Sequence, residues 1–218
     1  MDELLLVLSN GKPGREADYV QWYSSQHLDD VKRVPGVADG GLYTITKPDD
    51  AARWSVAARY PLSQPVESVL QGLFERTGTD AMPLTDAIDG KSVLMMGATP
   101  IGPRVRAEGV DDRQDGVIFV VLTNATEGDD DDFNGWYSDQ HIPDVLAVPG
   151  FIAAQRFKVA AETAGKASPW RYLSLYEVAP EDLDASMAEL QARAGGEKMP
   201  LSPTLANDVY ATLFSRAA

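Results

Sequence analysis

The chain carries one motif twice. The segment WYSSQHLDDVKRVPG at residues 22–36 recurs as WYSDQHIPDVLAVPG at residues 136–150, and ten of the fifteen positions are identical. The longer segments 4–45 and 118–159 align without a gap at an offset of 114 residues. Self-similarity of this kind indicates that one structural unit occurs twice. We therefore predict two related halves within the 218 residues.

Each half is predicted to have the element order β-α-β-β-α-β, which is the ferredoxin-like motif. In the first half we expect strands and helices, in chain order, at 4–9, 15–28, 37–46, 53–60, 65–77 and 91–98. In the second half they are expected at 117–123, 129–142, 151–159, 169–178, 181–194 and 207–215. Two helices cover only one face of such a sheet, so the other face needs a partner. The predicted fold class is α+β: two tandem ferredoxin-like repeats forming an intramolecular dimeric α/β barrel.

The predicted domain boundaries follow from the repeat. Residues 1–98 form the first repeat and residues 117–218 form the second. Between them lies the segment 99–116, rich in proline, glycine and charged residues, which is typical of a linker.

Composition excludes several classes of partner. The formal net charge of −14 repels phosphate backbones and anionic lipids, so we expect no nucleic-acid partner and no membrane partner. No apolar stretch approaches the roughly 18 residues of a membrane span, and the acidic start at Met1–Glu3 is unlike a signal peptide. Cysteine is absent, which suits a reducing compartment. A cytoplasmic location is therefore predicted.

One helical stripe carries the candidate chemistry. Helical spacing places six residues of the first half on one face: Tyr19, Trp22, Tyr23, Gln26, His27 and Asp30. The second half repeats the stripe as Phe133, Trp136, Tyr137, Gln140, His141 and Asp144. The stripe begins aromatic and ends polar, whereas a stripe meant only for a core would stay apolar. Histidine, tyrosine and aspartate beside an aromatic wall could form an acid/base site for a small apolar molecule.

The second copy is the stronger candidate. Pro143 disfavours helix at Ile142, so we predict that the first helix stops near His141 and that a short helix starts at Pro143. The helix dipole and Asp144 would then both favour the protonated form of His141. Copy one has Asp29 at the position of Pro143. The predicted catalytic residues are His141, Tyr137, Asp144, His27, Tyr23 and Asp30.

A second set of residues is predicted to bind substrate: Trp136, Trp22, Arg156, Asn124, Asn10 and Gln140. Arg156 has no counterpart in copy one and could hold a carboxylate or phenolate. A structural alternative stands beside each assignment, because buried Trp-Tyr pairs usually form core, a helical aspartate often caps, and asparagine favours turns. No protein-built metal site is expected, since the only two histidines lie in different halves.

These residues resemble the EthD-like family of the dimeric α/β barrel superfamily. The resemblance rests on Trp136-Tyr137, His141, Pro143-Asp144, Val148–Phe151 and Arg156-Phe157, and in copy one on Trp22-Tyr23, His27, Asp30 and Val34–Gly36. It covers nearly the whole chain. It implies the barrel fold and a range of reactions, since the superfamily includes cofactor-free cyclases, decarboxylases, lactone isomerases, quinone-forming monooxygenases and tandem haem proteins.

The function expected from residues and resemblance together is a cofactor-independent enzyme of lyase, isomerase or cyclase type. Histidine acid/base catalysis would act on a small hydrophobic, aromatic or polyketide-like compound in catabolism or secondary metabolism. A non-catalytic small-molecule binding protein is the alternative, and haem binding is a weaker one. No cofactor is expected. The expected assembly is an intramolecular pseudo-dimer, with a further homodimer left open.

Overall fold

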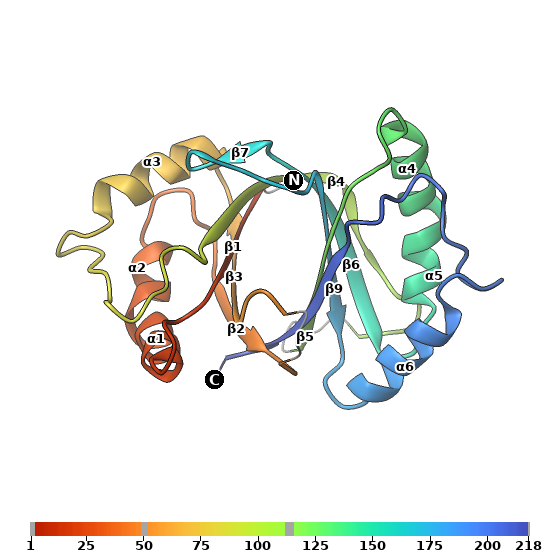
Figure 1. Cartoon of the computed structure of the whole chain (residues 1–218), viewed down its shortest axis with the longest axis horizontal. Helices are drawn as coiled ribbons and strands as arrows, with labels where there is room; N and C mark the ends of the chain where they lie inside the picture. Colours follow the sequence, from red (N-terminus) through yellow and green to blue (C-terminus); the bar gives the residue numbers. More distant parts are fainter. Residues whose placement is uncertain (1–2, 49–51, 112–115, 218) are drawn as a thin grey trace. The chain divides into compact units, whose positions relative to one another are not determined.

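The structure is a computed structural model that describes residues 3–48, 52–111 and 116–217 (Figure 1). It is an α+β protein whose strands pair antiparallel. The chain divides into two compact units. Unit 1 comprises the residues up to Pro100, Val159–Pro169 and the segment from Phe214 onward. Unit 2 comprises Ile101–Lys158 and Trp170–Leu213.

The sheet of unit 1 has the order β4-β1-β3-β2, followed by the end of β10. Its strands are β1 (Glu3–Ser9), β2 (Gly41–Ile45), β3 (Val56–Leu62), the first half of β4 (Leu94–Arg106) and the last residues of β10 (Tyr210–Arg216). The register of β1 against β3 runs from Glu3 opposite Leu62 to Ser9 opposite Val56. A short hairpin, β7 (Glu162–Thr163) and β8 (Lys166–Ala167), also belongs to this unit.

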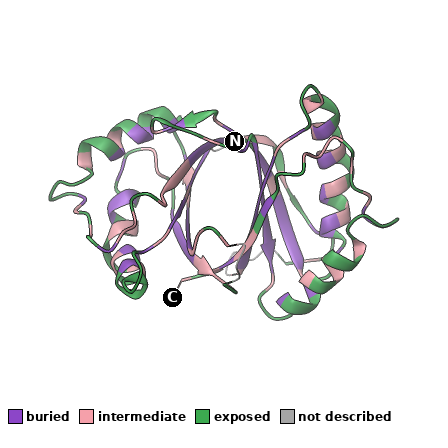
Figure 2. Ribbon diagram, in the orientation of Figure 1, coloured by how far each residue is buried: buried purple, intermediate pink, exposed green. Residues whose placement is uncertain are grey.

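Helices cover one face of that sheet (Figure 1). A continuous helical rod consists of α1 (Glu16–Trp22), the π turn η1 (Tyr23–His27) and α2 (Leu28–Lys32), and α3 (Val66–Arg76) lies beside it. The core between sheet and helices is aliphatic near α3 and aromatic near α1, where Tyr19, Tyr23 and Tyr60 are all buried. Figure 2 shows the buried residues on the strands and on the helix faces turned toward them.

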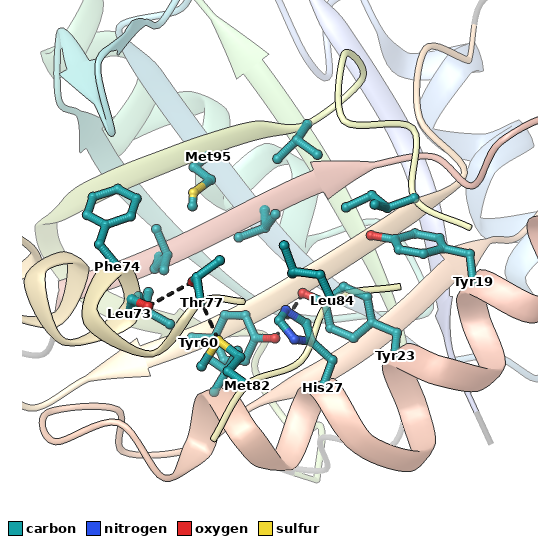
Figure 3. A pocket seen from close by; sticks show the side chains of 15 residues that line it. Tyr19, Tyr23, His27, Tyr60, Leu73, Phe74, Thr77, Met82, Leu84 and Met95 are labelled. Carbon is teal, nitrogen blue, oxygen red and sulfur yellow. Dashed lines mark hydrogen bonds between the residues drawn. The ribbon is translucent and has the colours of Figure 1, made fainter. Parts of the chain in front are cut away.

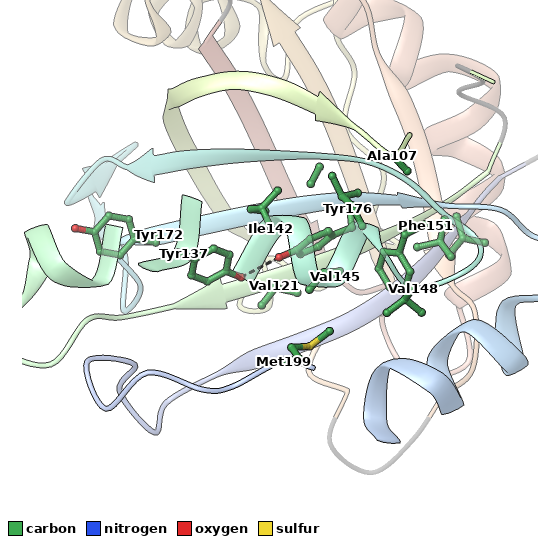
Figure 4. Close-up of a cluster of buried hydrophobic side chains, with 14 of the residues drawn as sticks. Ala107, Val121, Tyr137, Ile142, Val145, Val148, Phe151, Tyr172, Tyr176 and Met199 are labelled. Carbon is green, nitrogen blue, oxygen red and sulfur yellow. Dashed lines mark hydrogen bonds between the residues drawn. The ribbon is translucent and has the colours of Figure 1, made fainter. Parts of the chain in front are cut away.

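Unit 2 repeats this arrangement. Strands β5 (Val117–Thr123), β9 (Tyr172–Val178) and β6 (Phe151–Val159) pair in that order, and a bulge interrupts β6 between Phe151 and Ala153. The helical rod consists of α4 (Asp130–Trp136), the π turn η2 (Tyr137–His141) and α5 (Ile142–Leu146), followed later by α6 (Leu183–Arg193). Figure 4 shows the core of this unit, in which Tyr137, Tyr176 and Phe151 pack among aliphatic side chains.

Two sequence predictions need correction. Residues 99–106, expected to begin a linker, continue strand β4. Pro100 and Pro103 are tolerated there because this part of the strand is largely solvent-exposed, where a missing N–H leaves no buried partner unsatisfied. Residues 112–115 of the expected linker lie outside the described residues. The helix expected to stop at His141 instead continues through a π turn, with His141 and Ile142 both in helical conformation.

Candidate active site

The π turn is common to both halves. Trp22, His27 and Leu28 all keep right-handed helical dihedral angles around η1, as the corresponding residues do around η2. Only the second half carries a proline after it, so Pro143 is not the cause of the turn. Its missing N–H is instead accommodated in the first turn of α5, where the hydrogen-bond register has just changed. Single π turns inside α-helices often mark functional sites.

The wider turn stacks each histidine on a tryptophan. Because π-type hydrogen bonds join residues five apart, His27 returns over Trp22, with ring centroids 4.4 Å apart and an angle of 20° between the rings. The edge contact of His27 with Tyr23 measures 4.9 Å between ring centroids. In unit 2 the stack of Trp136 with His141 measures 4.8 Å. Both imidazoles are therefore held on two sides by aromatic rings.

A pair of tyrosines lies next to each histidine. The hydroxyl oxygens of Tyr23 and Tyr60 are 2.9 Å apart, and Tyr176 donates a hydrogen bond to Tyr137 at 3.3 Å (Figures 3 and 4). Tyr60 and Tyr176 come from the middle strands β3 and β9. Neither was among the candidate site residues, although the two tyrosines occupy corresponding positions of the two halves, at an offset of 116 residues. That match could have identified both tyrosines as candidate site residues.

Burial sets the protonation of these groups. Desolvation raises the pKa of the Tyr23 hydroxyl well above its ordinary value, with the neighbouring Tyr60 adding to the effect. Burial likewise raises the pKa of Tyr60, and it raises the pKa of Tyr19 to about 12. The phenols of unit 1 are therefore neutral hydrogen-bond donors at neutral pH.

Both histidines are also neutral, which corrects the sequence prediction. Burial lowers the pKa of His27 to about 4, only partly opposed by Asp30. Burial lowers the pKa of His141 to about 4 as well, and the charge of Arg156 adds to the effect. The expected helix end that would favour the charged imidazole does not exist, because the helix continues. Nδ1 of each imidazole is buried without a hydrogen-bond partner among the described residues.

The two candidate aspartates differ. Asp30 is buried and accepts a hydrogen bond from Arg33 at 2.8 Å. Ala147 occupies the position of Arg33 in unit 2, and Asp144 is only half-buried. Neither aspartate is hydrogen-bonded to a histidine among the bonds found for the described residues.

The other predicted binding residues lie in several places. Asn10 has a structural role. Its side-chain oxygen accepts a hydrogen bond from the backbone N–H of Ser55 at 2.7 Å and another from the Ser55 hydroxyl at 2.9 Å. Asn124 makes the matching bond to the N–H of Arg171 at 2.9 Å. Gln140 is exposed, because the π turn rotates it away from the stripe. Trp136 donates to the carbonyl of Pro200 at 3.3 Å.

Unit 1 contains an apolar cavity of about 190 Å³ beside these groups (Figure 3). The aromatic part of its wall comprises Tyr19, Tyr23, His27, Tyr60 and Phe74. The rest is aliphatic or thioether except for Thr77, so the lining contains no ionised side chain at neutral pH. In Figure 3, the side chains of His27, Tyr23 and Tyr60 lie close together in the wall of the cavity.

In unit 2, the guanidinium of Arg156 lies over the ring of Tyr137, with Cζ 4.3 Å from its centroid. Arg156 is buried at 3% exposure, and Phe133 and Tyr172 flank it at 5.5 Å and 5.8 Å. Leu42 occupies the equivalent strand position in unit 1. Leucine cannot supply the positive charge that Arg156 places over the ring of Tyr137.

Haem does not fit the unit 1 site. The cavity of about 190 Å³ is smaller than the roughly 300–1,000 Å³ typical of pockets for drug-sized ligands. His27 is held between Trp22 and Tyr23 rather than presented to a large apolar slot.

Among residues 3–48, 52–111 and 116–217, no group of three or more histidine, aspartate or glutamate side chains could hold a metal ion. No helix in this part of the chain is long and apolar enough to cross a membrane.

Comparison with solved structures shows that other proteins have a similar fold. An anthrone oxidase-like protein superposes with a TM-score of 0.68 at 11% identity, covering 100% of this chain and 91% of the other. A monooxygenase-like protein from Lactobacillus acidophilus gives 0.57 at 8% identity, covering 99% and 93%. A mutant chlorite dismutase from Candidatus Nitrospira defluvii gives 0.59 at 9% identity, covering 98% and 91%.

These proteins belong to the dimeric α/β barrel superfamily. The chain shares their fold. The likeness shows fold alone, because the identities are low. The sequence matches no protein-family profile and no curated protein.

Proposed function

We propose that the cavity of unit 1 binds a small, neutral aromatic ketone or polyketide-like molecule and abstracts a proton from a carbon whose anion is conjugated with the carbonyl group, without a cofactor. Such a step begins isomerase, cyclase and lyase reactions. The observation that carries the proposal is that a neutral imidazole and a hydrogen-bonded phenol pair line the same apolar cavity.

His27 is the proposed general base. A base must be unprotonated at the working pH, and the pKa of His27 is lowered to about 4 by burial. The imidazole lines the cavity, so it can reach a bound molecule. In the proposed step the carbon–hydrogen bond breaks, the proton moves to the imidazole, and the electron pair moves to the carbonyl oxygen as an enolate.

The Tyr23–Tyr60 pair is the proposed donor to that oxygen. Two phenols carry two hydroxyl hydrogens, and the bond between them at 2.9 Å uses only one. The second hydrogen can be donated to the developing oxyanion. Because burial raises the pKa of both hydroxyls, they stay protonated and keep this capacity. A donor fixed in a dry site stabilises charge that develops in the transition state.

The apolar lining and rim favour a hydrophobic ligand. Phe74 and Leu84 line the cavity and yet are 57% and 53% exposed. Large apolar side chains at a cavity mouth can contact the part of a ligand that extends outward. The absence of ionised side chains from the lining favours a neutral molecule over a carboxylate.

We assign this chemistry to unit 1 and not to unit 2, which reverses the order favoured by the sequence. Arg156 stacks on Tyr137 and fixes a positive charge beside His141. Leu42, at the position of Arg156, supplies no charge, and no Lys, Arg, Asp or Glu lines the unit 1 cavity. The anthrone oxidase-like neighbour supports the ligand class, since an anthrone is an aromatic ketone with an acidic methylene group conjugated to its carbonyl through the aromatic rings.

The test is deuterium exchange into anthrone in D₂O under argon, followed by NMR, with the protein in catalytic amount. We expect the chain to accelerate exchange at the carbon that bears the acidic hydrogens. His27→Gln should lose roughly 10²–10⁴-fold of that acceleration. His141→Gln is the matched control and should retain it. Equal loss in both variants, or no acceleration by the native chain, would refute the proposal.

A non-catalytic binding protein is the second candidate. It is favoured by Nδ1 of His27, which has no hydrogen-bond partner among the described residues to fix its tautomer. Catalytic histidines are commonly oriented through that second nitrogen. Binding of anthrone to the native chain without any acceleration of exchange would favour this candidate.

We also propose an EthD-like origin, two ferredoxin-like repeats at 1–98 and 117–218, and a cytoplasmic location. The repeated motif, the shared π turn and the matched tyrosine pairs support the two repeats. An intramolecular pseudo-dimer follows from the two repeats, and sedimentation would show whether it pairs further.

A further inference from the structure

Arg156 is a buried cation whose hydrogen bonds go only to neutral groups. Its Nη1 donates to the carbonyl of Asn134 at 3.3 Å and to Ser138 Oγ at 2.8 Å, and its Nη2 donates to Asn134 Oδ1 at 2.8 Å. Nε is buried without a hydrogen-bond partner. Among the described residues no aspartate or glutamate forms an ion pair with this guanidinium.

The surrounding aromatic rings compensate only part of the cost of burying this charge. Tyr137 is the closest, at 4.3 Å from Cζ. Cation–π contacts are attractive, but buried charges are ordinarily paired with an opposite charge or bound to an ion. Desolvation lowers the pKa of Arg156, and an arginine remains protonated nonetheless. The site therefore carries positive charge that no described carboxylate neutralises.

A pocket of about 230 Å³ opens onto Arg156 within unit 2. Its walls come from the second half of β4, the η2–α5 helix and β6. Ile101, Pro103, Ile142 and Ala154 make its lining mostly apolar, and Ser138 and Asp139 are the other polar side chains. Tyr137 and His141 are not part of the lining, so the pocket is separate from the tyrosine–histidine group of this unit.

We propose that this pocket binds a small monocarboxylate with an apolar body, held by Arg156 and Ser138. Ser138 Oγ accepts a hydrogen bond from Arg156, so its own hydrogen remains for a carboxylate oxygen. One Nη2 hydrogen of Arg156 also lacks a described acceptor and can bind the other oxygen. The apolar walls then receive the body of the ligand.

Asp139 makes the pocket more selective among anions. Its carboxylate lies on the exposed side of the helix and lines the same pocket. A like charge nearby repels a dianion such as phosphate more strongly than a monoanion. The pocket should therefore prefer a carboxylate to inorganic phosphate, and a carboxylate with a ring or short chain to acetate.

The experiment is calorimetric titration of the full chain with benzoate, benzamide and inorganic phosphate. Benzoate should bind at least tenfold more tightly than its neutral isostere benzamide and than phosphate. Arg156→Leu, which introduces the residue found at position 42, should weaken benzoate at least tenfold. Lys158→Gln removes one positive charge from the exposed side of the same strand and should leave benzoate binding unchanged.

Arg156→Lys and Ser138→Ala keep the test decisive if Arg156→Leu does not fold. Each retains part of the site and should weaken benzoate several-fold, because lysine lacks the planar fork and alanine lacks the hydroxyl. The proposal is overturned if benzamide binds as tightly as benzoate, if the folded Arg156 variants bind benzoate normally, or if the native chain binds no benzoate at millimolar concentration. None of these outcomes bears on the anthrone exchange assigned to unit 1.

Discussion

The imidazole of His27 stacks on the indole of Trp22 because a π turn separates them, with ring centroids 4.4 Å apart. In a regular α-helix, residues five apart do not share a face. The turn thus brings the imidazole face to face with the indole, while Tyr23 makes an edge contact with it. Burial of the imidazole lowers its pKa to about 4.

The first prediction concerns the pH dependence of activity. If His27 is the base, the rate of anthrone exchange should fall only when pH drops toward about 4, because protonation then removes the base. A histidine with an ordinary pKa would lose activity near pH 6.5. Exchange rates between pH 4 and 8 provide the measurement, and an acid limb centred near 6.5 would contradict the assignment.

The second prediction concerns stability. The folded-state pKa of His27 lies below its unfolded value, so the unfolded chain binds more protons between about pH 4 and 6.5. Stability must therefore decrease as pH falls through this window, by on the order of 3 kcal/mol for this histidine. His27→Gln should reduce the slope of that part of the curve, while His141, whose pKa is also lowered to about 4, keeps its own contribution. Urea melts at several pH values test this, and unchanged slopes would contradict it.

The third prediction separates the two tyrosine pairs. Tyr60→Phe removes one hydroxyl from the unit 1 cavity and should slow exchange by about 10²-fold if the pair stabilises an oxyanion. Tyr176→Phe makes the matching change in unit 2 and should leave the rate unchanged. Each loses one buried hydrogen bond, worth about 1 kcal/mol of stability. Similar melting temperatures with different rates would be the expected pattern.

The fourth prediction concerns the rim of the cavity. Leu84→Ala should weaken binding of anthrone several-fold, because it removes apolar contact at the cavity mouth. Leu201 occupies the aligned position in the second half and is similarly exposed, at 51% against 53%. Leu201→Ala should therefore not change binding. Fluorescence titration would reveal the difference, and equal effects of both changes would argue against a ligand at this mouth.

The fifth prediction concerns two glycines. Gly150 has φ of +93°, and an added Cβ would lie 2.1 Å from Ser186 Oγ, so Gly150→Ala should destabilise the chain by at least about 2 kcal/mol. Gly135 lies in α4 with open space around it, so Gly135→Ala should stabilise by roughly 0.5–1 kcal/mol. Thermal melts compare the two, and a tolerated alanine at 150 would contradict the steric argument.

The sequence alone determined the order of elements and the identity of the aromatic stripe. Both are encoded locally, by hydrophobic periodicity and by the gapless match of the two halves. The sequence also places Tyr60 and Tyr176 at corresponding positions of the two halves. Their approach to Tyr23 and Tyr137 was invisible because it joins a strand to a helix distant in the chain.

Only the tertiary structure decided the protonation of the histidines and the place of the cavity. A local rule placed His141 at a helix end, whereas the observed helix changes register and continues. The pKa of a buried group depends on every atom that displaces water from it, and those atoms come from remote segments. For the same reason Leu42 and Arg156, equivalent in sequence position, leave one aromatic group neutral and give the other a buried charge.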